Sequence, residues 1–113
     1  MRIDICTSVY ERATRANGAR GDQVARALAE PTRLSILRTL LQHGELSCGE
    51  LAERFPIAQS TVSHHLNTLM QAELVAMRKQ GQHHYFRPVR DTLCAFARWL
   101  ATLDKTECEK IPL

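Results

Sequence analysis

The sequence has 113 residues, of which 44% are hydrophobic and 24% charged, and its formal net charge is +3. These values are typical of one globular domain and exclude a disordered, collagen-like or membrane-embedded chain, since no stretch approaches the roughly eighteen consecutive apolar residues of a membrane span. The N-terminal segment lacks the apolar centre of a secretory signal, so we expect a cytoplasmic protein that folds as a single domain over residues 1–113 and does not contact a membrane.

Three helices are predicted in the first half of the chain. Apolar residues at helical spacing predict a short helix over about 5–17, and Gly18 provides its stop. Asp22 is a suitable N-cap for a second helix, and Pro31 ends that helix or begins the next, since proline is tolerated only in the first helical turn. A third helix, strongly apolar and expected at the centre of the core, ends at Gly44. Its apolar residues are Leu34, Ile36, Leu37, Leu40 and Leu41.

Two further helices are predicted to form a helix-turn-helix over about 47–72. Ser47 and Glu50 have the spacing of a capping box, which begins a short helix that Pro56 ends. After a tight connection, a second helix begins at Gln59 with an apolar face on one side. That face consists of Val62, Leu66, Leu69 and Met70. Two short helices joined by such a turn are typical of a helix-turn-helix.

A β-hairpin and a final helix complete the predicted elements. The hairpin spans about 74–87 and turns near Gly81. Tyr85 and Phe86 alternate across its second strand, so we expect at least one of them to pack in the core. The last helix spans about 91–107 and carries apolar residues on more than one side, which predicts burial on more than one face.

Positive charge is concentrated around the helix-turn-helix and the hairpin. Residues 54–90 carry five Arg or Lys against Glu73 alone, whereas residues 1–53 carry seven charges of each sign. A solvated face and a phosphate-facing surface are both compatible with such an excess. A helix-turn-helix followed by a two-stranded ribbon is a winged helix. Because the positive excess falls on this motif, the sequence favours a nucleic-acid-binding protein that is mainly α with a small β-hairpin.

The predicted DNA contacts lie at the start of the second helix of the pair and on the hairpin. A helix in the major groove recognises base edges through short polar side chains near its N-terminus. A basic hairpin tip suits phosphates or the minor groove, although a solvated tip has the same composition. His65 lies near the apolar face, which predicts a structural histidine. The helix candidates are Gln59, Ser60, Thr61, Ser63, His64 and Asn67, and the hairpin candidates are Arg78, Lys79, Gln82, His83 and Tyr85.

Four segments of the chain resemble the ArsR/SmtB family of bacterial winged-helix repressors. They are ALAEPTRLSILRTLL, ELSCGELAERF, QSTVSHHLNTLMQAELV and RKQGQHHYF, and the match runs from about Gln23 to Phe86. The resemblance implies a homodimer formed by the first and last helices (5–17 and 91–107), recognition of an imperfect inverted repeat in double-stranded DNA, and release of that DNA by an inducer. The chain departs from the family at Ala58, where a serine usually begins the recognition helix, so we expect a weaker N-cap.

The two metal-binding motifs of the family are broken in this sequence. Arsenic- and cadmium-type members carry a CxC pair where this chain has Ser47-Cys48-Gly49. Zinc-sensing members carry D-x-H and H-x-x-E on the last helix, and this chain keeps that spacing without the histidines, as Asp91, Leu93, Asp104 and Glu107. Thiolates and imidazoles supply much of the affinity for such ions, so no intact metal site is predicted.

Four cysteines are the candidates for a thiol-based sensor: Cys6, Cys48, Cys94 and Cys108. The alternative is that they are reduced structural thiols, since a domain of this length needs no disulfide. Cys94 and Cys108 would lie about 21 Å apart on one continuous helix, so they would meet only across an antiparallel dimer. Persulfide-sensing relatives use a cysteine where this chain has Arg38. The inducers left open are a metalloid or metal ion, or oxidation of redox-active thiols.

Two other function classes fit the sequence less well. An enzyme needs a nucleophile or an acid–base pair that converges on a pocket, and the sequence contains no motif for one. A winged helix that binds protein without operator DNA has little need for the positive excess around the hairpin. We therefore expect a sequence-specific transcriptional repressor and not an enzyme.

Overall fold

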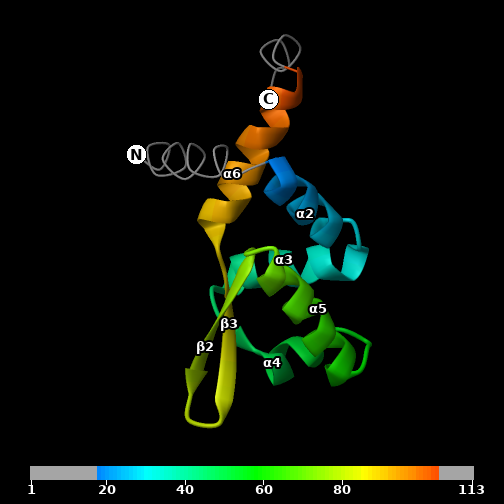
Figure 1. Cartoon of the computed structure of the whole chain (residues 1–113). Helices are drawn as coiled ribbons and strands as arrows, with labels where there is room; N and C mark the ends of the chain where they lie inside the picture. The colour runs from blue at the N-terminus through cyan, green and yellow to red at the C-terminus, as the bar shows by residue number, and fades with distance from the viewer. Residues whose placement is uncertain (1–17, 105–113) are drawn as a thin grey trace. The chain divides into compact units, whose positions relative to one another are not determined.

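The computed structural model describes residues 18–104, so the expected helix over 5–17, together with Cys6, Cys108 and Glu107, lies outside the described residues. Within this range the chain forms two compact units, one of residues 23–89 and one that joins residues 18–22 to residues 90–104. None of the described helices is long and apolar enough to cross a membrane. The elements in chain order (Figure 1) are α2 (Gly18–Leu28), α3 (Pro31–His43), β1 (Leu46–Ser47), α4 (Cys48–Ala52), α5 (Gln59–Gln71), β2 (Val75–Gln80), β3 (His83–Pro88), α6 (Arg90–Ala101) and the 3-10 turn η1 (Thr102–Asp104).

Capping residues set the boundaries of α3 and α4. Glu30 is the N-cap of α3, where its carboxylate accepts a 3.0 Å hydrogen bond from a first-turn backbone N–H, and Pro31 is the first helical residue. Gly44 follows the last residue of α3 as its C-cap, and its φ of 90° favours glycine. Ser47 N–H donates to Glu50 Oε1 at 2.8 Å, and Glu50 N–H donates to Ser47 Oγ at 3.1 Å. The predicted stop at Gly44 and the capping box are therefore confirmed.

Two expectations for the first helices are wrong. Asp22 does not cap the second helix but lies inside α2, which begins at Gly18. An acidic residue near a helix N-terminus is favoured both as a cap and in the neighbouring turns, so its presence does not locate the first residue. Leu34 is expected in the buried stripe of α3 but is 42% exposed. Helical spacing identifies which residues share a face, and not what packs against that face.

The core of the 23–89 unit is apolar. No polar or charged side chain is buried among the described residues. α5 packs against α3, α4 and β2. The largest fully buried side chains are Val24, Ile36, Leu40, Leu51, Val62, Leu66, Leu69 and Leu74. Since three of these come from one side of α5, the other side of that helix faces outward.

A three-stranded antiparallel sheet in the order β1–β3–β2 contains the predicted hairpin. β2 and β3 pair along their whole length, and Gly81, with φ of 64°, lies in the turn. Figure 1 shows this hairpin as a long ribbon beside α3, α4 and α5. Phe86 is buried, as expected for one of the two hairpin aromatics. The sequence did not predict β1, in which Leu46 pairs with Phe86, because two residues have no alternation of their own.

The second unit contains α6, η1 and the first residues of α2. A Cβ at Gly21 would lie only 2.5 Å from the Trp99 ring, so glycine permits this close approach. The predicted burial of the last helix on more than one face is wrong for a single chain. Ala95 is the buried residue of α6, whereas Leu100 and Leu103 are 45% and 64% exposed. An apolar pattern does not distinguish packing within the chain from packing against another chain.

Candidate nucleic-acid interface

α5 presents a polar face to solvent. Val62, Leu66 and Leu69 are fully buried on its inner side, which determines the direction of the remaining residues. The exposed polar residues are Gln59, Ser60, Thr61, Ser63, His64 and Asn67. The prediction that this side of the helix faces outward is confirmed, and contact of these residues with DNA stays a prediction.

The first turn of α5 has no side-chain cap. Ala58 occupies the N-cap position and makes no side-chain hydrogen bond there, as expected from the missing serine. Thr61 N–H already donates to the Ala58 carbonyl at 3.0 Å, whereas the earlier amides of a helical first turn have no partner inside the helix and are left to water or to an anion. α5 therefore begins with backbone donors close in the chain to the exposed side chains of Gln59 and Ser60.

Arg33 connects the start of α3 with the middle of α5. Its Nε donates to the Ala27 carbonyl at 2.7 Å, and its Nη1 lies 3.5 Å from His65 Nδ1. His65 Nε2 lies 3.9 Å from Glu30 Oε1, in keeping with a structural role for this histidine. Arg33 was not among the candidates from the sequence, although a cation in the first turn of a helix is disfavoured by the helix dipole. These contacts hold α5 against the junction of α2 and α3.

The strand register divides the predicted hairpin contacts between two faces. Arg78 is opposite Tyr85, whereas Lys79 is opposite His84. Directly opposed residues of an antiparallel pair lie on the same face, and neighbours along a strand lie on opposite faces. His83 shares the face of Tyr85, and their ring centroids are 6.3 Å apart. The structure therefore groups Arg78, His83 and Tyr85, and places Lys79 on the other side.

Arg78 is bound by Glu45, a residue that the sequence analysis missed. Its Nε and Nη2 donate to the two carboxylate oxygens of Glu45 at 3.0 and 2.9 Å, and its Nη1 donates to Gln80 Oε1 at 2.7 Å. The hydrogen bond from Arg78 holds the pKa of Glu45 below its usual value, and the same bond raises the pKa of Arg78. Glu45 and Arg78 are 33 residues apart, so no local sequence pattern links them.

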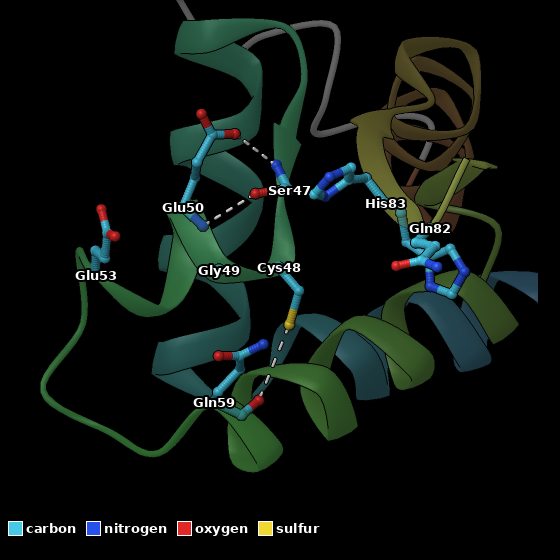
Figure 2. Close-up of a pocket in the computed structure, with 9 residues that line it drawn as sticks. Ser47, Cys48, Gly49, Glu50, Glu53, Gln59, Gln82 and His83 are labelled. Atoms are coloured by element: carbon cyan, nitrogen blue, oxygen red, sulfur yellow. Dashed lines mark hydrogen bonds between the residues drawn. The ribbon is translucent and has the colours of Figure 1, made fainter. Parts of the chain in front are cut away.

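A groove of about 450 Å³ lies where the starts of α4 and α5 meet the hairpin (Figure 2). Cys48 Sγ lies in it, 4.0 Å from the Gln59 carbonyl oxygen. Burial raises the pKa of the Cys48 thiol, which reduces the share of the thiolate that binds metals and reacts. Among the described residues, no three His, Cys, Asp or Glu side chains are placed to hold a metal ion. The geometry therefore does not favour Cys48 as a sensor.

Comparison with known proteins identifies the family. Residues 28–78 match a family described as a helix-turn-helix domain. The transcriptional repressor SdpR of Bacillus subtilis is 42% identical over 65 residues, which are 58% of this chain and 71% of that protein. The solved structure of an ArsR-like transcriptional regulator from Rhodococcus sp. RHA1 matches 81% of this chain and 85% of its own, with a TM-score of 0.71 and 30% identity. The chain belongs to the ArsR family.

As an ArsR-family protein, the chain is a DNA-binding transcriptional regulator and not an enzyme. The predicted family, winged helix-turn-helix fold and regulatory function are confirmed, and the protein-interaction alternative has no support. A homodimeric winged helix-turn-helix DNA-binding domain from Mycobacterium bovis is also similar. It is 30% identical with a TM-score of 0.63, and the match covers 78% of this chain and 82% of that domain.

Proposed function

We propose that this ArsR-family regulator represses transcription by occupying a promoter as a homodimer on an imperfect inverted repeat. One α5 from each protomer enters the major groove of one half-site. The observation that carries this proposal is the exposed polar face of α5 beside the basic hairpin. The positive excess over residues 54–90 supplies attraction to phosphates. The likeness to SdpR, a transcriptional repressor, supports repression.

The α5 face offers two kinds of contact with DNA. The Gln59 amide suits a two-point pair with adenine, and the hydroxyl groups of this face can bond to bases or phosphates. His64 and Asn67 continue the same exposed side along the helix. The uncapped amides at the start of α5 suit one phosphate oxygen. In this arrangement the helix both recognises sequence and anchors the protein.

Lys79 is the hairpin residue that we propose for the main phosphate contact. It is exposed and, within the described part of the chain, makes no ion pair with an acidic side chain. Gln82 and His83 lie exposed at the tip, where they suit phosphates or the minor groove. Arg78 is already bound by Glu45 and covers the Tyr85 ring, so its charge is less available to a phosphate than that of Lys79.

We propose that α6 forms part of the dimer interface, together with residues 5–17. Leu100 and Leu103 expose apolar surface that a second copy can bury. The Mycobacterium bovis relative is a homodimer, which supports the same assembly here. A dimer spaces two recognition helices about one turn of DNA apart, roughly 34 Å, and this matches an inverted repeat.

We propose Cys94, paired with Cys6 or Cys108, for a thiol-based release of DNA. Cys94 lies on α6, so a change at its sulfur acts on the proposed dimer interface. Such a change releases DNA only to the extent that it favours a dimer geometry unsuited to the operator. Cys94 is disulfide-bonded in this structure, so operator binding should differ between the oxidised and the reduced protein, and Cys94→Ser should abolish that difference.

Fluorescence anisotropy tests the proposed function. The reduced protein is titrated onto DNA from upstream of its own gene, with random DNA at the same salt concentration as the control. A preference of about a thousandfold or more is expected of a specific regulator. If that fragment is not preferred, selection from a random pool supplies the operator. Failure to select any sequence would contradict the proposal.

A further inference from the structure

The outer face of the sheet carries a set of contacts that crosses all three strands. Arg78 lies on β2, and its guanidinium carbon is 4.9 Å from the centre of the Tyr85 ring on β3. Beyond Tyr85, two guanidinium nitrogens reach both carboxylate oxygens of Glu45, which immediately precedes β1. The third nitrogen donates to Gln80 on the same strand as Arg78. Each of the three guanidinium nitrogens therefore donates one hydrogen bond within the protein, which uses three of the five N–H groups.

A two-point pair fixes the orientation of the guanidinium as well as its distance from the carboxylate. Glu45 follows Gly44, the C-cap of α3, and precedes β1, so it belongs to the body of the 23–89 unit. Arg78 belongs to the hairpin. The pair thus ties the hairpin to the end of α3 and to β1.

We propose that Glu45 and Arg78 form a clamp that sets the direction of the hairpin on DNA, and that Arg78 itself makes no phosphate contact. Glu45 is a positioning residue in this proposal, since it acts through Arg78 on the placement of Lys79 and the hairpin tip. The inference rests on the proposed function in one respect, namely that the hairpin touches DNA.

If Arg78 instead binds a phosphate, substitutions of Glu45 and Arg78 have a different effect on DNA affinity. In that case Glu45 competes with DNA for the guanidinium, so Glu45→Gln strengthens binding. Arg78→Lys would keep most of the affinity, because lysine keeps the charge. With a clamp, both variants weaken specific binding, because neither retains a charged two-point pair.

The test is a salt series of anisotropy titrations on the selected operator and on random DNA of equal length. The variants are Glu45→Gln, Arg78→Lys, Arg78→Gln and the double variant Glu45→Gln/Arg78→Gln. The clamp predicts that each lowers the ratio of operator to random affinity by about fivefold, the upper range for an exposed ion pair. It also predicts that the double variant loses no more than a single variant, and that the slope of log affinity against log salt stays at its wild-type value.

Hydroxyl-radical footprinting on the operator shows where the variants lose contact with DNA. A misdirected hairpin should leave the backbone unprotected in the flanks of the site, while the backbone on either side of the groove that holds α5 stays protected. Three results would overturn the clamp: stronger operator binding by Glu45→Gln, wild-type binding by Arg78→Lys, or a salt slope reduced by about 0.9 per protomer in Arg78→Gln.

Two control variants separate failure of the clamp from failure of the proposed function. Lys79→Gln should reduce the salt slope by about 0.9 per protomer, and no change would mean that Lys79 does not bind a phosphate. Glu53→Gln removes an exposed acid of the same unit outside the clamp, so it measures the general effect of losing one negative charge. If Lys79→Gln behaves as expected while the Glu45 and Arg78 variants bind like wild type, the clamp alone is wrong. Thermal melting followed by circular dichroism shows which variants remain folded.

Discussion

Ser47 and Ala58 begin two successive helices with different capping. Ser47 completes both hydrogen bonds of a capping box at the start of α4, whereas Ala58 makes no side-chain hydrogen bond at the start of α5. A serine at an N-cap stabilises a helix by about 1 kcal/mol relative to alanine. The helix proposed to enter the major groove is therefore the less securely capped of the pair.

Ala58→Ser should raise the free energy of unfolding by about 1 kcal/mol, because the serine hydroxyl can accept a hydrogen bond from a first-turn amide. Urea denaturation without DNA, followed by circular dichroism, measures the change. Ser47→Ala is the matched variant and should lower the free energy of unfolding by a similar amount. An unchanged midpoint in Ala58→Ser, beside the expected loss in Ser47→Ala, would show that a side chain at position 58 cannot cap α5.

Cys48 should be slow to alkylate near neutral pH. Burial raises the pKa of its thiol, and the thiolate is the reacting form. In a variant whose other three cysteines are replaced by serine, the rate of reaction with iodoacetamide should rise with pH through a midpoint above that of a free cysteine peptide. A midpoint at or below the peptide value would return Cys48 to the candidate sensors.

At the scale of elements, the predictable parts are those whose signals lie within one segment. The ends of α3 and α4 follow from Pro31, Gly44 and the capping box, and the polar face of α5 follows from its apolar spacing. β1 was not predictable, because it exists through pairing with β3. The contact of Arg78 with Glu45 was missed for the same reason, since it joins distant segments across that sheet. Because of that contact we propose Lys79, and not Arg78, as the main phosphate contact of the hairpin.

Gly21→Ala should destabilise the protein, although alanine ordinarily strengthens a helix by about 0.5–1 kcal/mol. A Cβ at this position would lie 2.5 Å from the Trp99 ring, and overpacking of this kind costs about 1–3 kcal/mol. Trp99 is the single tryptophan, so its fluorescence in a urea titration reports the change.

Gly49→Ala is the control for Gly21→Ala. The nearest atom to a Cβ there is Ser47 Oγ at 3.9 Å, an ordinary contact, so this variant should not lose stability. Equal effects of the two substitutions would mean that the approach to Trp99 does not constrain α2.

At the scale of the whole molecule, the exposed apolar surface of α6 predicts a contact with a second copy. Leu100→Glu should shift the protein from dimer to monomer in sedimentation equilibrium, because the interface would have to bury a carboxylate. Operator affinity should fall with it, since a monomer engages one half-site.

Leu34→Glu is the matched variant for Leu100→Glu. Leu34 has similar exposure at 42% but lies on α3, outside the proposed interface, so the dimer should persist. A dimeric Leu100→Glu protein would exclude this part of α6 from the interface.

Ser47 also links the parts that we propose to meet DNA. It is the last residue of β1, paired with Tyr85 of the hairpin, and at the same time the N-cap of α4. No linker separates β1 from α4, so the strand pair and the capping box hold the base of the hairpin beside α4, and the proposed Glu45–Arg78 clamp acts further along the hairpin. Within the 23–89 unit of each protomer, the hairpin and the helix-turn-helix would then approach DNA together. The spacing between the two units of a dimer would be a separate quantity, so the number of base pairs between half-sites would select the operator alongside the bases within them.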